Sequence, residues 1–268
     1  EILLNSKKMA VFTSELVRHA ERLNQLKPRI MTGKLLGAVG SGAAMYPHTL
    51  EVQRLVCEKL DLNEPLATTQ ILGRDRIAEV IAWGANLATS IEKFTLEVRN
   101  LQRSDIGEVA EAFNVEKQVG SSTMAQKKNP ITSENVGGLA RIVRSVLYSS
   151  YENNLQWHER DLANSSNERI ILPQFYILLE FIIKKTENVF SNLYVNKQRM
   201  KDNLDSAGGL PMAEAFVISL GKTDLGRQKA HELVRNITMD AEKKAITFSQ
   251  NISENKDVKK YLTKEEIT

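Results

Sequence analysis

Proline is rare in this chain, and its placing limits the folds that the chain can adopt. The chain has 268 residues and six prolines, and none of them lies within residues 66–129 or 131–172. A proline inside a helix costs about 3 kcal/mol, so these tracts leave room for long helices. Apolar residues recur through them at helical spacings, as at Ile77, Ile81 and Leu87, and strand-like alternation is absent. The sequence therefore predicts an all-α bundle of several long helices.

Polar and glycine-rich segments mark the expected breaks between these helices. Four glycines fall within residues 33–42, a small polar loop spans residues 118–123, and Asn164-Ser165-Ser166 interrupts a later apolar stripe. Such residues favour turns and loops. We expect two domains: a central long-helix domain over residues 1–196, incomplete at its start, and a small C-terminal helical domain over residues 197–268.

Composition excludes several classes of protein. Hydrophobic residues make up 42% of the chain and charged residues 26%, which is typical of a globular protein. Lys and Arg exceed Asp and Glu by 36 − 33 = 3, too small a surplus to indicate a nucleic-acid or membrane partner. No apolar run is long enough to cross a bilayer. One cysteine, Cys57, and four scattered histidines give neither a disulfide framework nor the spacing of a zinc site.

The segment with the most chemical information is GSSTMAQKKNP, residues 120–130. By residue type alone it is a flexible glycine-serine loop that leads into a helix. Its main-chain N–H groups, together with Lys127 and Asn129, could hold a carboxylate or a phosphate. An ordinary surface loop with lysines for solubility fits the same composition.

This segment resembles the signature of the fumarase/aspartase superfamily of lyases, G-S-S-x-M-P-x-K-x-N-P. Seven of the eight specified positions match, and Ala125 stands where the superfamily has proline. Three more segments resemble the adenylosuccinate lyase family within that superfamily, in the same order and spacing. They are GKLLGAVG at residues 33–40, TQILGRDR at residues 69–76, and LQWHERDLANSSNER at residues 155–169.

The resemblance implies a lyase that eliminates fumarate from adenylosuccinate to give AMP, and from SAICAR to give AICAR, in purine nucleotide biosynthesis. One alternative is an argininosuccinate lyase or another fumarate-releasing member of the superfamily, because argininosuccinate lyases also carry QKKNP, as at residues 126–130. We rank it second because residues 157–169 do not resemble that family. A non-catalytic helical scaffold is a further alternative. It is motivated by Ala125 in place of proline and by the absence of the segment that carries the family's general acid.

Individual roles follow from the match to the motif. Ser121 is the expected base, and Ser122 is the alternative. A serine hydroxyl is a poor base, so nearby N–H groups and cations must favour its ionised form. Lys127 would stabilise the dianionic intermediate and, with Asn129, bind the departing carboxylates. Glu134 would orient a catalytic histidine. The expected contacts to the nucleotide and the rest of the substrate come from Gln70, Arg74, Arg160, Ser165 and Arg169.

The general acid of the family is a histidine in a T-x-H segment, and this sequence lacks that segment. In the family it lies a few residues before the point that matches the start of this chain. We therefore expect a fragment without the N-terminal domain. The resemblance also implies a cytoplasmic homotetramer in which the central helices form one bundle and three chains build each active site. It implies no metal and no organic cofactor.

Overall fold

The structure is a computed structural model that describes residues 2–112 and 128–267. It divides into two compact units, residues 3–195 and residues 196–267. The all-α prediction is confirmed. Within the described residues the strands are limited to β1 (Val109–Ala110) and β2 (Tyr194–Val195), which form one short antiparallel ladder with Val109 opposite Val195.

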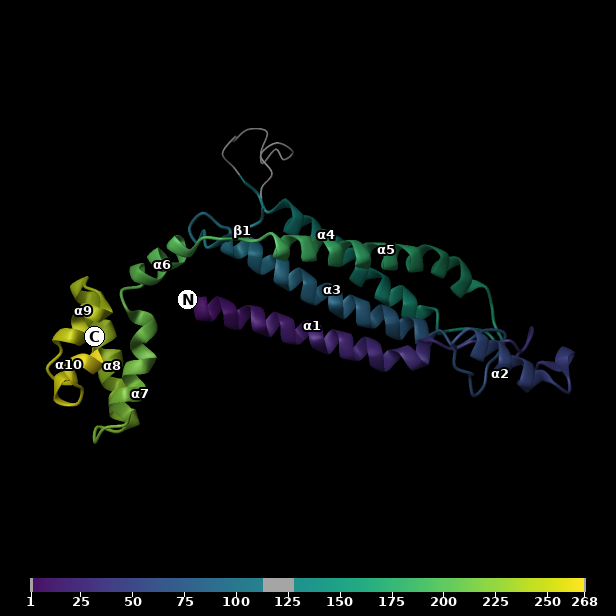
Figure 1. Cartoon of the computed structure of the whole chain (residues 1–268), viewed down its shortest axis with the longest axis horizontal. Helices are drawn as coiled ribbons and strands as arrows, with labels where there is room; N and C mark the ends of the chain where they lie inside the picture. Colours follow the sequence, from purple (N-terminus) through teal and green to yellow (C-terminus); the bar gives the residue numbers. More distant parts are fainter. Residues whose placement is uncertain (1, 113–127, 268) are drawn as a thin grey trace. The chain divides into compact units, whose positions relative to one another are not determined.

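The larger unit is a bundle of long helices. Figure 1 shows α1, α3, α4 and α5 running alongside one another, with α2 at one end of the bundle and β1 with the start of α4 at the other. Side-chain bonds join α1 to α3, α3 to α4 and α4 to α5 in antiparallel order. The helix bounds are α1 (Ile2–Ile30), α2 (Thr49–Lys59), α3 (Asp75–Leu101), α4 (Ile131–Glu152) and α5 (Ala163–Ser191).

A continuous apolar core holds α3, α4 and α5 together. Phe175 of α5 is fully buried and packs over Gly84 of α3, where a Cβ atom would stand only 2.3 Å from the Phe175 ring. The small residue lets the two helices approach closely, and the aromatic ring fills the space between them. Other buried members of the core are Ile81, Ala88, Ile91, Val136, Ala140, Val143, Leu179 and Ile182. These positions follow the apolar spacing of the sequence.

One expected break is wrong. Asn164-Ser165-Ser166 lies inside the first turn of α5 rather than between helices. The reason is a local cap, because the carboxylate of Asp161 accepts hydrogen bonds from the main-chain N–H of Trp157 (3.0 Å) and of Ala163 (2.8 Å). Asp161 therefore satisfies a donor at the start of the helix, and the polar residues after it can be helical.

The smaller unit is a cluster of short helices with its own core. Leu220, Val234, Phe248 and Val258 are among its most deeply buried side chains. A capping box begins α9, since Thr247 and Gln250 exchange side-chain to main-chain hydrogen bonds of 3.2 and 3.0 Å. The helix bounds are α6 (Lys197–Ser206), α7 (Ala213–Gly221), α8 (Arg227–Lys244), α9 (Phe248–Glu254) and α10 (Lys264–Ile267). Among the described helices of both units, none has the length and apolarity needed to span a membrane.

Candidate active site

Those residues singled out from the sequence that the structure describes lie at the two ends of the long-helix unit. At one end, α3 finishes beside β1 and the start of α4, and we call this the Asn129 end. Gln102, just after α3, joins these parts: its Nε2 donates to the carbonyl oxygen of Lys128 (3.0 Å) and its Oε1 accepts from the N–H of Glu111 (2.9 Å). The last residues of the signature segment are therefore held against the end of α3.

Glu111 fixes the start of α4 at this end. Its carboxylate accepts hydrogen bonds from the main-chain N–H groups of Thr132 (3.1 Å) and Ser133 (2.6 Å). The N-cap residue of α4, Pro130, provides no side-chain cap, so the carboxylate of Glu111 takes over that role. Sequence reasoning missed Glu111, because it lies 21 residues before Thr132 and the capping spacings are local.

A groove of about 870 Å³ lies at the Asn129 end. Asn129 and Glu134 line it from the signature side, Arg99 lines it from α3, and Arg103 lines it from the turn after α3. Glu134 is exposed in the first turn of α4, where a carboxylate complements the helix macrodipole. The structure thus brings together two of the predicted site residues. Three more predicted residues, Ser121, Ser122 and Lys127, lie outside the described residues.

The opposite end of the unit, which we call the Arg74 end, carries the other predicted residues. Arg74, at the start of α3, is bound to Glu168 of α5 through two bonds, Nε to Oε1 at 2.7 Å and Nη2 to Oε2 at 2.8 Å. The two side chains are 16% and 11% exposed. Glu168 thus already occupies much of the guanidinium fork that the sequence analysis assigned to the substrate, and the pair ties α3 to α5.

Two segments of the resemblance meet at the Arg74 end. Lys34 donates from Nζ to the carbonyl oxygen of Gln70 (2.6 Å), and the side chain of Gln70 is exposed. Gly40 has a φ of +79°, and a Cβ atom there would lie 2.2 Å from the carbonyl oxygen of Thr68. Only glycine fits this close approach at positive φ. The loop of residues 33–40 is therefore packed directly against the segment that carries Gln70.

The third segment, residues 155–169, adds three more predicted residues to this end. Arg160 and Ser165 are half-buried and Arg169 is exposed. Three buried polar atoms of this segment have no hydrogen-bond partner among the described residues: Gln156 Nε2, Arg160 Nε and Asn164 Oδ1. Buried polar groups are nearly always satisfied, so these atoms mark a place where further bonding groups fit. The main-chain N–H groups of Trp157 and Ala163 also hold the pKa of the Asp161 carboxyl below its ordinary value, which favours its charged form.

One chain keeps the two ends apart. Arg74 stands at the start of α3 and Gln102 at its finish, and a helix of 27 residues is about 40 Å long. Asn129 and Glu134 therefore cannot share one small-molecule site with Arg160 and Ser165 of the same chain. A site that uses both sets needs more than one copy of this chain.

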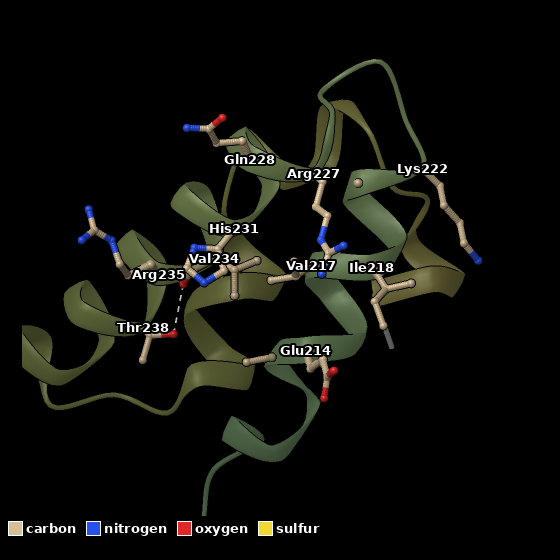
Figure 2. Close-up of a pocket in the computed structure, with 12 residues that line it drawn as sticks. Glu214, Val217, Ile218, Lys222, Arg227, Gln228, His231, Val234, Arg235 and Thr238 are labelled. Atoms are coloured by element: carbon tan, nitrogen blue, oxygen red, sulfur yellow. Dashed lines mark hydrogen bonds between the residues drawn. The ribbon is translucent and has the colours of Figure 1, made fainter.

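A separate cavity of about 1070 Å³ lies in the smaller unit, between α7 and α8. Figure 2 shows Arg227 extending along α7 and Lys222 and Arg235 directed outward. None of the predicted site residues lines this cavity. The exposed cations around it fit a solvated surface.

Comparisons with known proteins follow the same division of the chain. A family model described as "Lyase" matches residues 5–145, more than half of the chain. The chain belongs to this lyase family. A second model, described as "Adenylosuccinate lyase C-terminus", matches residues 209–268, which lie in the smaller unit.

Curated relatives of this lyase chain extend beyond it. An adenylosuccinate lyase of Methanothermobacter thermautotrophicus is 44% identical over 97% of the chain, and the chain covers 58% of that protein. The adenylosuccinate lyase of Bacillus subtilis is 41% identical over 97% of the chain, and the chain covers 59% of that protein. The chain thus spans somewhat more than half the length of the curated relatives that it matches.

Solved structures support the same fold for this lyase chain. A fumarate lyase from Mesorhizobium sp. BNC1 superposes with a TM-score of 0.84 at 28% identity, over 97% of this chain and 57% of that one. A β-carboxy-cis,cis-muconate cycloisomerase from Acinetobacter calcoaceticus gives a TM-score of 0.83 at 26% identity, also over 97% and 57%. The helical bundle is therefore shared between relatives whose names describe different reactions.

Proposed function

We propose that the protein eliminates fumarate from adenylosuccinate to give AMP, and from SAICAR to give AICAR, in purine nucleotide biosynthesis. The observation that carries the proposal is the identity of 44% to an adenylosuccinate lyase over 97% of the chain. The match of residues 209–268 to the C-terminal model of adenylosuccinate lyases supports it independently. An argininosuccinate lyase is not favoured, because only the short QKKNP run suggests it.

The proposed chemistry is a β-elimination that begins with loss of a proton. Ser121, or Ser122 in its place, takes the proton from the carbon beside a carboxylate of the succinyl group. That carboxylate then carries the developing charge, which Lys127 and Asn129 stabilise. The C–N bond breaks as an acid protonates the nitrogen, and fumarate leaves. We assign Glu134 to orienting that acid, which the resemblance identifies as a histidine.

The nucleotide half of the substrate would lie against the Arg74 end of a chain. Arg160 and Arg169 have planar donor forks that suit phosphate, and Ser165 adds a hydroxyl donor. The unsatisfied buried atoms of Gln156, Arg160 and Asn164 support a ligand at this end. Gln70 would contact the base or the succinyl group.

We further propose that the protein works as a cytoplasmic homotetramer with active sites shared between chains. The length of α3, about 40 Å, supports sharing, because Asn129 and Arg160 lie near its opposite ends within one chain. Exposed apolar side chains on α4 and α5 support association: Tyr148, Ile170 and Ile177 are 74%, 69% and 66% exposed. Large exposed apolar patches usually mark interfaces. Residues 1–196 and 197–268 would be the two domains that this chain contributes.

An ultraviolet assay of adenylosuccinate cleavage on the full-length protein tests the activity. We expect the parent to release fumarate and Ser121→Ala to lose at least about 100-fold in kcat, the usual contribution of a positioned base. Substrate binding by that variant should be retained. Lys128→Ala, which changes a neighbouring lysine without a role in the motif, is the control and should keep most of the activity.

The outcomes of this assay identify the base and test the proposed function. Activity that survives in Ser121→Ala but disappears in Ser122→Ala would move the base to Ser122. A folded full-length parent that releases no fumarate from adenylosuccinate or SAICAR would refute the proposed function.

A further inference from the structure

The groove at the Asn129 end contains an arginine that no motif singled out. Arg99 lies near the end of α3 and lines the groove together with Asn129 and Glu134. Its side chain is half-buried, and it has no hydrogen bond or ion pair with any described residue. A guanidinium that is partly removed from water and lacks an acceptor is unusual, because arginine carries five N–H donors.

Neighbouring arginines do have acceptors, which sets Arg99 apart. Arg103, two residues after the end of α3, lines the same groove, and Asp105 accepts two bonds from it, Nε to Oδ1 at 3.2 Å and Nη2 to Oδ2 at 2.5 Å. Arg141 and Arg144 of α4 share the carboxylate of Glu92, at 3.5 and 2.5 Å.

The carboxylate of Glu92, which could pair with Arg99, is thus already bound to two other arginines. A Cβ atom on Gly137 would stand 3.7 Å from Glu92 Oε1 and 3.9 Å from Arg99 Nη1, so both groups face the same spot on α4. Glu92 is bound by Arg141 and Arg144, and Glu134, the carboxylate that lines the groove, makes no ion pair with Arg99. The guanidinium of Arg99 therefore remains favourable for an anion.

We propose that Arg99 binds a carboxylate of the substrate's succinyl half and, after the elimination, of fumarate. This inference rests on the proposed function. The succinyl group carries two carboxylates, and the described part of the signature segment brings Lys128 and the amide of Asn129 to the groove. Arg99 adds a guanidinium to the same groove from α3. Its planar fork can hold a carboxylate through two parallel bonds, which gives orientation as well as affinity.

Arg99 in this role selects for a dicarboxylate. Arg99 and Asn129 line the same groove, so a dicarboxylate can engage both groups, whereas a ligand with one carboxylate leaves one of them without a partner. The residue also holds the succinyl carbon skeleton in place while the base removes the proton. AMP, the other product, carries no carboxylate and does not depend on Arg99.

Product inhibition of the full-length enzyme separates these effects. Inhibition constants for fumarate and for AMP are measured against adenylosuccinate for the parent, Arg99→Gln and Arg99→Lys. Arg103→Gln is the matched control, because it removes a guanidinium of the same groove that already has a carboxylate partner. We expect Arg99→Gln to raise the fumarate constant by about 10- to 100-fold, the range for losing a charge-assisted pair, and to leave the AMP constant within about twofold. Arg99→Lys should weaken fumarate less, and Arg103→Gln should change neither constant.

Two results would overturn the proposal. One is an unchanged fumarate constant in Arg99→Gln, and the other is an equal rise for fumarate and AMP, which indicates a general loss of structure. If Arg99→Gln does not fold, Arg99→Lys decides by the same comparison. A parent without lyase activity is a failure of the proposed function instead. In that case calorimetric titration of fumarate into the parent and into Arg99→Gln tests the carboxylate site by itself, and equal affinities refute it.

Discussion

The Arg74–Glu168 pair makes a demanding test of how the long-helix unit is held together. The pair joins the start of α3 to the first turns of α5 through two bonds of 2.7 and 2.8 Å, and both side chains are largely shielded from water. Replacing Arg74 with Met leaves the Glu168 carboxylate partly buried without its cation. Removing one partner of a buried pair typically costs about 3–5 kcal/mol. Because 16% and 11% of the two side chains remain exposed, we expect about 3 kcal/mol, the lower end of this range.

A second pair in the same unit provides the control. Arg29 and Glu79 join α1 to α3, also through bonds from Nε to both carboxylate oxygens, at 3.1 and 2.7 Å. Their side chains are 53% and 39% exposed, so water screens the interaction. Arg29→Met should therefore lower the free energy of unfolding far less than Arg74→Met does. The two substitutions are chemically identical and differ mainly in burial.

The measurement is urea unfolding of the full-length protein at one fixed protein concentration, because association contributes to the apparent free energy. The double variant Arg74→Met, Glu168→Met should recover most of the loss, since it removes both charges. Equal costs for Arg74→Met and Arg29→Met would refute the reasoning from burial. The double variant also tests the proposed substrate role of Arg74: restored stability with a still elevated KM supports that role, and a restored KM argues against it.

Two further predictions concern packing and pH. Gly84→Ala should lower the free energy of unfolding by about 1–3 kcal/mol, because the new methyl group would lie 2.3 Å from the Phe175 ring. Gly138→Ala, on the open surface of α4, should instead raise the free energy of unfolding by about 0.5–1 kcal/mol. Urea unfolding of both variants tests whether the two changes have opposite signs. Burial, with the charge of Arg22 adding to it, lowers the pKa of His19 below its ordinary value, so the unfolded chain binds the proton more readily. Stability is then complete above about pH 6.5 and falls as the pH drops below it, and His19→Gln should reduce the difference in unfolding free energy between about pH 7.5 and about pH 5.5.

Local patterns account for what the sequence predicted correctly about the fold. The positions Ile77, Ile81 and Leu87 were expected on one helical stripe; Ile81 and Leu87 are buried in the core, and Ile77 packs against it. Helical periodicity is a local property, so a single sequence carries it well. The error at Asn164-Ser165-Ser166 has a local cause as well, because the capping carboxylate of Asp161 comes three residues earlier and moves the helix start forward. The domain boundary near residue 196 stays a prediction.

The contacts that the sequence did not predict join residues far apart in the chain. The salt bridge of Arg74 reaches across 94 residues to Glu168, and the cap of α4 reaches across 21 residues from Glu111. No spacing rule links residues so far apart in the chain. Arg99 was missed for a related reason, since it belongs to none of the four segments that carry the resemblance and is marked only by its place in the groove. The motif did predict that Asn129 and Glu134 belong together.

The distance along α3 leads to a prediction about the assembly. If each active site takes its base from one chain and its nucleotide-binding residues from another, a chain with Ser121→Ala and a chain with Arg160→Gln are defective at different sites. Each variant alone should be inactive. Unfolding and refolding an equal mixture should form some sites with both native residues, about a quarter of the total if chains combine at random. Fumarate release should then rise to about a quarter of the parental rate, while each variant taken alone through the same procedure stays inactive.

A mixture that stays inactive would mean that Ser121 and Arg160 of the same chain serve one site. That arrangement would require the base loop to reach the far end of a helix about 40 Å long. Since Gln102 and Glu111 hold Lys128 and the start of α4 at the Asn129 end, the loop's exit is fixed far from Arg160. The geometry of a single chain therefore favours restored activity, and the experiment asks whether the assembly follows from it.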